Sequence, residues 1–175
     1  FKLNNQGVEL RSHPVMLDKN SSLAGLKGVR NGIQFDTDLL GEFHVAGSGA
    51  GRESTSSGLI SDLFALSKSQ EVPPMIYPDF SNKPSILNFK DLIFKFYVYL
   101  EVKDESGVLA LISKIFAEHT ISFDKVIQKD QLESGNVPLV IITDPIVESE
   151  MQVALQDLEN HPVILNAKII RIEDL

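Results

Sequence analysis

Large apolar residues occupy every second position between residues 94 and 102, and this alternation constrains the fold more than any other feature. The apolar set is Phe94, Phe96, Val98, Leu100 and Val102. Successive side chains of a strand point to opposite faces of a sheet, so one face of this strand is expected to pack on a core. A helical period follows directly, with apolar residues at Val108, Leu109, Ile112, Ile115 and Phe116. A strand leading into an amphipathic helix is therefore predicted.

The remaining residues extend this pattern to the end of the chain. Residues 121–128 and 139–143 predict two further strands, separated by a turn at 130–136. A second amphipathic helix is indicated by Met151, Ala154, Leu155 and Leu158, and residues 163–172 predict a fourth strand. The order β-α-β-β-α-β predicts an α+β, ferredoxin-like fold, with an antiparallel sheet and two helices on one face. Asp104 is expected to cap the first helix, and residues 94–102 to form an edge of the sheet.

A proline-rich stretch divides the chain. Four of the eight prolines lie within residues 71–90, where no helical or strand period is sustained. Because proline fixes φ and restricts the residue before it, this stretch predicts an extended linker. The expected organisation is one segment at residues 1–70, a linker at 71–90 and a second domain at 91–175.

Charge and composition restrict the class of partner. The net charge is −8, and residues 91–175 account for all of it, with seven basic and fifteen acidic side chains. A nucleic-acid surface requires clustered Lys and Arg, so no nucleic-acid partner is expected. No apolar run approaches the roughly 20 residues that span a bilayer. With no cysteine, and with four histidines that lack metal-ligand spacing, no metal site is expected. We expect a cytoplasmic protein whose partners are small molecules or protein chains.

The first half carries a glycine-rich segment. A strand at 8–15, a short helix at 23–28 and a hairpin at 32–45 are predicted before it, and a helix with an apolar face follows at 59–66. Glycines between a strand and a helix allow backbone N–H groups to cradle a phosphate. However, Arg52 stands where a G-x-G-x-x-G motif requires Gly or Ala, and no Gly-Lys-Ser/Thr occurs. The residues alone leave open a phosphate-binding loop or a plain tight turn.

The second half resembles an ACT domain, a small amino-acid-sensing module of metabolic enzymes. The matching residues are 104–110 (Asp-Glu-Ser-Gly-Val-Leu-Ala), 116–119 (Phe-Ala-Glu-His), 121–123 (Ile-Ser-Phe) and Gln128. Ser106 departs from the proline of many such domains. The resemblance implies an effector site formed by Asp104, Gly107, Val108 and Gln128. A helix N-terminus suits the carboxylate of an amino acid, and the Asp104 carboxylate suits its ammonium group. The alternative roles are a cap for Asp104, packing for Gly107 and solvent exposure for Gln128.

The first half resembles the closing segment of a homoserine dehydrogenase catalytic region. The matching residues are 10–14 (Leu-Arg-Ser-His-Pro), 23–31 (Leu-Ala-Gly-Leu-Lys-Gly-Val-Arg-Asn), 47–51 (Gly-Ser-Gly-Ala-Gly), Thr55 and Asp62, with departures at Ser48 and Ser56. This family interconverts L-aspartate 4-semialdehyde and L-homoserine with NAD(P), in threonine and methionine biosynthesis. The resemblance implies cofactor contacts by Gly49, Ala50, Gly51 and Thr55. It also implies a catalytic Lys and Asp on preceding elements, which neither Lys2 nor Lys19 matches.

Together these resemblances predict the C-terminal part of a homoserine dehydrogenase, with the end of the catalytic domain followed by an ACT domain. The chain alone is expected to be inactive, to hold no catalytic residue and to bind no cofactor tightly. We expect threonine as the first candidate effector and a homo-oligomer, in particular a dimer. Two alternatives explain only residues 93–174: an amino-acid-binding regulatory protein without an enzymatic part, and the regulatory tail of another enzyme such as a prephenate dehydrogenase.

Overall fold

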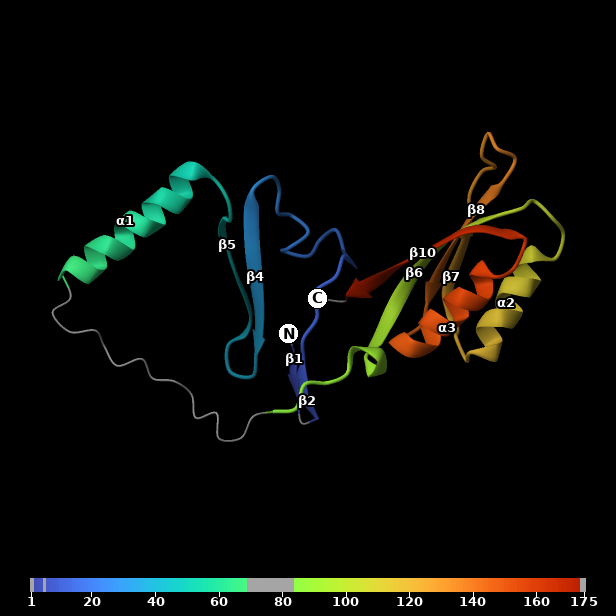
Figure 1. Ribbon diagram of the computed structural model, residues 1–175, viewed down its shortest axis with the longest axis horizontal. Helices are drawn as coiled ribbons and strands as arrows, with labels where there is room; N and C mark the ends of the chain where they lie inside the picture. Colours follow the sequence, from blue (N-terminus) through green and yellow to red (C-terminus); the bar gives the residue numbers. More distant parts are fainter. Residues whose placement is uncertain (1, 5, 69–83, 174–175) are drawn as a thin grey trace. The chain divides into compact units, whose positions relative to one another are not determined.

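The computed structural model describes residues 2–4, 6–68 and 84–173 (Figure 1). These residues form two units, each described here by itself. Unit 1 comprises Phe1–Met16 and Pro84–Asp174, and unit 2 comprises Leu17–Lys83 together with Leu175. Most of the predicted linker lies outside the described residues, so the predicted domain boundary stays a prediction. The first residues of the chain, however, cluster with the C-terminal unit and not with unit 2.

Unit 1 is built on one six-stranded sheet, in which the order of the strands differs from their order in the sequence. Its strands are β3 (Val15–Leu17), β6 (Ile93–Val102), β7 (Phe123–Gln128), β8 (Val137–Thr143) and β10 (Ile164–Glu173), in the order β3-β10-β6-β8-β7. Short β9 (Ile146–Val147) pairs with the start of β6. The pairs β10–β6, β6–β8 and β8–β7 are all antiparallel. A separate hairpin joins β1 (Lys2–Asn4) to β2 (Gly7–Glu9).

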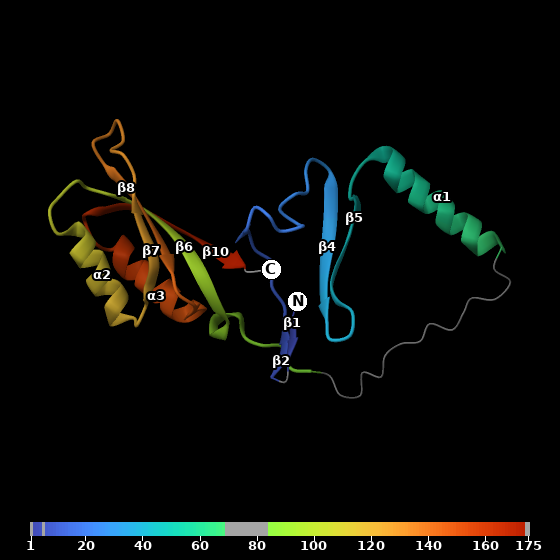
Figure 2. The ribbon, with the colours of Figure 1, turned by 180° about the vertical axis from the view of Figure 1, so that it is seen from behind.

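Two helices cover one face of this sheet. Helices α2 (Val108–Glu118) and α3 (Glu148–Glu159) lie side by side against it, as both views show (Figures 1 and 2). Strand β6 buries every second side chain, as its alternation predicts. The largest fully buried side chains of the core include Phe96, Leu100, Ile112, Phe116, Ile141, Met151 and Leu158. The mixed α+β class predicted from the sequence is confirmed, and the strands and helices follow one another in the predicted order.

Three local predictions for unit 1 are wrong. Strand β6 lies between β10 and β8, so residues 94–102 are not an edge. Asp104 does not cap α2, because Gly107 takes the N-cap position with φ +89° and no side-chain cap bond forms. Leu109 is 47% exposed, since only Val108, Ile112, Ile115 and Phe116 of α2 face the core. The periodicity located the helix but not its exact first turn.

Unit 2 contains a hairpin and a helix. Strands β4 (Arg30–Thr37) and β5 (Gly41–Ser48) pair antiparallel, and the Phe35 and Phe43 rings stack across them at 4.8 Å. The predicted hairpin is therefore confirmed. The predicted strand at 8–15 is interrupted, because residues 10–14 are in neither strand, and residues 22–25 form turns where a short helix was predicted.

Helix α1 (Arg52–Lys68) follows the glycine-rich segment, as predicted. Its apolar residues are each more than half exposed, and none of its residues is buried among the described part of the chain. They are Leu59, Ile60, Leu63, Phe64 and Leu66. Unit 2 thus leaves exposed the kind of apolar side chain that is buried in the core of unit 1. No helix of the described residues is long and apolar enough to cross a membrane.

Candidate functional site

A glycine loop connects β5 to α1 and contains the predicted cofactor residues. Gly49, Ala50 and Gly51 form the loop, and Thr55 lies in the first turn of α1, where its N–H donates to the Gly51 carbonyl at 3.1 Å. Gly51 has φ +125°, a backbone conformation that residues with a Cβ rarely adopt. The structure brings all four residues to one strand–loop–helix junction. Their contact with a cofactor stays a prediction.

Close backbone packing explains one of these glycines. The Gly49 N–H donates to the Val29 carbonyl at 2.9 Å, and the Asn31 side chain occupies the space that a Cβ at Gly49 would need. Asn31 therefore shapes the loop, although no local pattern in the sequence indicates that it would contact Gly49. At the other end of the loop, the first N–H groups of α1 have no intrahelical partner, so they can donate hydrogen bonds to an anionic or carbonyl group.

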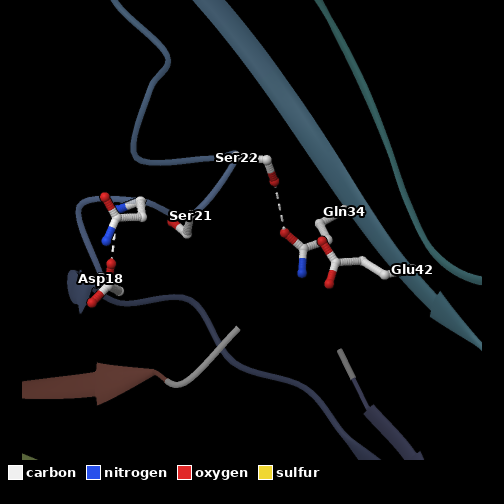
Figure 3. A pocket seen from close by; sticks show the side chains of 6 residues that line it. Asp18, Ser21, Ser22, Gln34 and Glu42 are labelled. Carbon is white, nitrogen blue, oxygen red and sulfur yellow. Dashed lines mark hydrogen bonds between the residues drawn. The ribbon is translucent and has the colours of Figure 1, made fainter.

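A polar hollow of about 420 Å³ lies beside the β4–β5 hairpin in unit 2. Its lining residues are Asp18, Asn20, Ser21, Ser22, Gln34 and Glu42. Figure 3 shows their side chains, with Ser22 Oγ donating to Gln34 Oε1 at 3.1 Å. The Asn20 backbone N–H donates to Asp18 Oδ1 at 2.8 Å. Sequence reasoning did not identify this hollow, because its residues come from a turn and two strands that only the fold brings together.

A second hollow, of about 160 Å³, brings together the four predicted effector residues in unit 1. It lies where the loop before α2 faces the ends of β6, β7 and β8. Asp104, Gly107 and Val108 come from the loop and the start of α2, and Gln128 ends β7. The remaining lining residues are Val102, Lys103, Glu105, Leu109, Val137 and Leu139. Its walls thus combine apolar strand residues, charged loop residues and a helix N-terminus.

Asp104 already has a partner in this hollow. Gln131 Nε2 donates to Asp104 Oδ2 at 3.2 Å and to the Gly135 carbonyl at 2.8 Å. Gln131 lies in the turn between β7 and β8, and sequence reasoning did not select it. A ligand ammonium group that bound Asp104 would have to share or displace this amide. An added Cβ at Gly107 would meet no atom within 4 Å, so the space above the loop is open.

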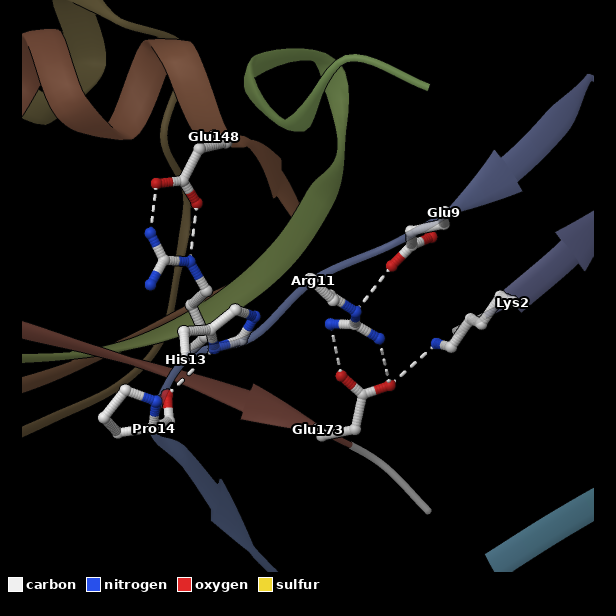
Figure 4. Close-up of polar contacts among 8 residues, drawn as sticks. Lys2, Glu9, Arg11, His13, Pro14, Glu148 and Glu173 are labelled. Carbon is white, nitrogen blue, oxygen red and sulfur yellow. Dashed lines mark hydrogen bonds and ion pairs between the residues drawn. The ribbon is translucent and has the colours of Figure 1, made fainter. Parts of the chain in front are cut away.

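A polar cluster joins the first residues of the chain to the end of β10 (Figure 4). The Arg11 guanidinium contacts Glu173 Oε2 at 2.6 Å and Glu9 Oε1 at 2.7 Å, and Lys2 Nζ lies 2.7 Å from Glu173 Oε1. Burial raises the pKa of the Glu173 carboxyl, but hydrogen bonds from Arg11 and Lys2, and then their positive charges, outweigh it. The pKa of Glu173 therefore lies below its ordinary value.

A second, deeper ion pair lies nearby within unit 1. Glu148, at the start of α3, is 2% exposed and accepts from Arg171 Nε at 2.8 Å and also from Arg171 Nη2. Gln152 donates to the same carboxylate at 2.8 Å. The Arg171 guanidinium lies 5.0 Å from the Phe89 ring centroid, so its charge is held between a carboxylate and an aromatic face. These contacts fix α3 to β10.

Comparisons with known proteins show which family this chain resembles. The family model described as homoserine dehydrogenase matches residues 1–64. The chain is 34% identical to the homoserine dehydrogenase of Helicobacter pylori over 95% of its length, and 31% identical to that of Pseudomonas aeruginosa over 97%. It belongs to the homoserine dehydrogenase family. The predicted family resemblance is therefore confirmed.

Solved structures of this family share the fold. A homoserine dehydrogenase from Thiobacillus denitrificans matches 99% of the chain with a TM-score of 0.81 and 27% identity. The Staphylococcus aureus homoserine dehydrogenase matches 93% with a TM-score of 0.53 and 19% identity. The chain spans about 40% of the H. pylori homoserine dehydrogenase and 41% of the T. denitrificans structure. The similarity thus extends across both units.

Proposed function

We propose that this chain is the part of an NAD(P)-dependent homoserine dehydrogenase that carries a cofactor loop and a regulatory ACT domain. The enzyme interconverts L-aspartate 4-semialdehyde and L-homoserine, a step toward threonine and methionine. The observation that carries this proposal is the similarity to homoserine dehydrogenases, which covers 95% of the chain for the H. pylori relative. A stand-alone ACT protein or a prephenate dehydrogenase tail would leave the match of residues 1–64 unexplained.

In this proposal the loop of Gly49, Ala50 and Gly51 lies against NAD(P), and the start of α1 with Thr55 faces a polar group of the cofactor. Bound NAD(P) would supply the hydride acceptor for homoserine oxidation and the hydride donor for the reverse reaction. The chain's own contribution is the exposed backbone of the loop, without a Cβ at Gly51, together with the dipole of a 17-residue helix. Proton transfer requires a Lys and an Asp that the family places on preceding elements.

The purified chain is therefore expected to show no homoserine-dependent reduction of NAD(P). The measurement is absorbance of the reduced cofactor, with a heat-treated sample as the control. Turnover above that control would overturn the assignment of the chain as an incomplete enzyme. Tight binding of NADP by the chain alone, measured by calorimetry, would show instead that the loop forms a complete cofactor site.

For unit 1, the proposed function is amino-acid sensing by an ACT domain with a ferredoxin-like arrangement. The sheet order β10-β6-β8-β7 and two helices on one face support this interpretation. The single supporting feature of the site is that Asp104, Gly107, Val108 and Gln128 line one hollow. The ligand carboxylate would lie at the N-terminus of α2, which favours an anion by roughly 0.3–1 kcal/mol. Its ammonium group would meet Asp104 in place of the Gln131 amide.

Calorimetric titration tests the sensing role, with threonine, homoserine, methionine and isoleucine as ligands. Threonine is expected to bind the wild type, and Asp104→Asn is expected to weaken binding by about tenfold or more, since a charge-assisted hydrogen bond contributes roughly 1.5–3 kcal/mol. Asp144→Asn, outside the hollow, is the matched control. Gly107 is unsuited to this test because its φ of +89° would strain any side chain. Equal affinity in wild type and Asp104→Asn would overturn the pocket assignment.

A homo-oligomer, in particular a dimer, is part of the proposal. Because β6 is interior, the edges of the described sheet are β3 and β7, and we take β7, whose Val126 and Ile127 are 41% and 48% exposed, as the edge for pairing. Exposed edge strands favour pairing with a second chain. Sedimentation of the chain at micromolar concentration is expected to give a mass above 19.4 kDa. A mass of 19.4 kDa only, over the whole concentration range, would contradict self-association.

A further inference from the structure

The hollow of unit 1 has a floor and a rim of different chemistry. The floor is apolar and is formed by buried side chains of the core: Val102, Val108, Val137 and Leu139. Val102 and Val137 lie opposite one another where β6 and β8 pair, and Val108 begins α2. The core of unit 1 therefore ends at the bottom of this hollow, and a group that enters it contacts aliphatic side chains.

The charged residues of the hollow belong to its rim. Lys103, Asp104 and Glu105 follow β6 directly and line the hollow beside the start of α2. The Lys103 ammonium group and the N–H groups at the helix start suit a carboxylate, and the Asp104 and Glu105 carboxylates suit an ammonium group. Both charges of an α-amino acid thus meet opposite charges at the rim. The side chain of such a ligand is left to face the floor.

The floor offers no side-chain partner to a hydroxyl group. Among the described residues that line the hollow, none carries a hydroxyl, and Gln128 is the one uncharged polar side chain. Gln128 ends β7 and is exposed, so it belongs to the rim. A ligand hydroxyl on the floor would exchange water for aliphatic carbon, which is unfavourable unless a new hydrogen bond replaces the one to water. A methyl group at the same position gains from the contact.

The size of the hollow restricts the ligand further. Its volume of about 160 Å³ is smaller than the roughly 300–1,000 Å³ that is typical of sites for drug-sized ligands. An aromatic side chain would remain partly in water above such a hollow. The volume therefore favours a short aliphatic side chain.

We propose that the hollow of unit 1 selects α-amino acids with a short aliphatic side chain, and that Val102, Val137 and Leu139 determine this selectivity. The inference rests on the proposed function, because it assigns the ligand class of the same site. It changes the expected order of effectors: valine and isoleucine bind more tightly than threonine and homoserine. The rim binds the charges that all these amino acids share, and the floor distinguishes their side chains.

Valine and threonine provide the sharpest test, because they have nearly the same shape and differ by a methyl group in place of a hydroxyl. In calorimetric titration of the full chain, L-valine is expected to bind about tenfold to 100-fold more tightly than L-threonine, since an apolar pocket rejects a hydroxyl-bearing isostere by up to about 100-fold. D-Valine is the control and is expected to bind more weakly than L-valine, because its side chain and charges do not meet floor and rim together. Equal affinities for L-valine and L-threonine, or tighter binding of L-threonine, would overturn the proposal.

A series of unbranched amino acids measures contact with the floor. From alanine to 2-aminobutyrate to norvaline, each added methylene is expected to strengthen binding about fourfold, as burial of one CH₂ group does. Homoserine replaces the terminal methyl group of norvaline with a hydroxyl and is expected to bind about tenfold more weakly than norvaline. A constant affinity along the series would show that the ligand side chain stays in water, and the floor would then not determine selectivity.

Val137→Thr places a hydroxyl on the floor with little change of shape. It is expected to reduce the preference for valine over threonine by about fivefold, the equivalent of one net hydrogen bond. Val153→Thr, at a position on α3 that is 46% exposed, is the matched control and is expected to leave the preference unchanged. Far-ultraviolet circular dichroism checks that Val137→Thr is folded, and Val102→Thr repeats the test from the opposite strand. An unchanged preference in the folded variants would overturn the role of these residues.

Failure of the proposed function gives a different result from failure of this inference. Tighter binding of threonine than of valine would overturn the selectivity and leave the sensing role intact. Absence of binding by every amino acid of the series, in calorimetry and in thermal unfolding, would overturn the sensing role and the selectivity together.

Discussion

Unit 1 and unit 2 use apolar residues in opposite ways. In unit 1, the alternating side chains of β6 and the helical stripes of α2 and α3 meet in one core, with Phe96 and Phe116 fully buried. In unit 2, the apolar side chains of α1 and several of β4 and β5 are exposed, including Leu63 at 66% and Phe64 at 62%. Burial of apolar area is the main stabilising term in folding, so unit 1 holds most of the stability of the described chain.

The exposed apolar residues of unit 2 lie on α1 and on the β4–β5 hairpin. Large apolar side chains that gather in this way and remain exposed within the described residues are typical of a surface that another part of a protein covers. The relatives of this chain are more than twice its length, since it spans about 40% of them. The difference between the units shows that a pattern of apolar residues indicates which residues of a segment can be buried. Whether they are buried depends on the presence of a partner that covers them.

The largest expected effect comes from the core of unit 1. Phe96→Ala is expected to lower the free energy of unfolding by about 3–5 kcal/mol, because a large buried side chain is lost and a cavity remains. Phe64→Ala in α1 is the matched variant and is expected to change it by less than about 0.5 kcal/mol. Urea denaturation followed by far-ultraviolet circular dichroism measures both. Equal losses in the two variants would contradict the contrast between the units.

Breaking the buried ion pair of unit 1 is expected to cause the next largest loss of stability. Arg171→Met leaves the Glu148 carboxylate buried without its cation, which typically costs about 3 kcal/mol or more. Glu42→Gln in unit 2 removes an exposed carboxylate and is expected to be nearly neutral. Thermal unfolding of the two variants makes the comparison. A double variant that replaces both members of the pair with apolar residues should recover part of the loss, because no buried charge remains unpaired.

Glu173→Gln is expected to have a smaller effect, which concerns how the stability of the chain depends on pH under acidic conditions. The pKa of Glu173 is lowered in the folded chain from the ordinary value of 4.5, so its ionised form stabilises the fold at higher pH. This contribution is complete above pH 4.5 and is lost as the pH falls through the lower pKa of the folded state. Glu173→Gln should therefore lose stability at pH 7 and show a flatter profile below pH 4.5. An unchanged acid limb would show that Arg11 and Lys2 do not stabilise the carboxylate.

The smallest expected effect concerns the hairpin of unit 2. Gly41 has φ +68° at the β4–β5 turn, so Gly41→Ala is expected to cost about 1 kcal/mol. Gly58→Ala, in the interior of α1 with open space around the added Cβ, is expected to stabilise the helix by up to about 1 kcal/mol. Opposite signs in thermal unfolding would support the assigned backbone conformations. A loss of stability in both variants would contradict the open space around Gly58.

The glycine loop shows which parts of a site the sequence can predict. The position of Gly49, Ala50 and Gly51 between a strand and a helix followed from the flanking patterns, and the structure has them there. The contact of Asn31 with Gly49 could not be predicted, because it depends on the register of β4 with β5. Likewise Gln131 reaches Asp104 only through the path of the turn after β7.

The sequence by itself determined the periodic elements of unit 1, their order, and the family. These properties arise from local spacing: a period of two for β6 and a period near 3.6 for α2 and α3. Tertiary structure alone decided that β6 is central and that Gly107 takes the N-cap of α2 in place of Asp104. It also decided that the first residues of the chain contact the end of β10 through Arg11 and Glu173. The position of β6 and the Arg11–Glu173 pair join residues far apart in the chain and depend on strand order and register, which no local pattern encodes.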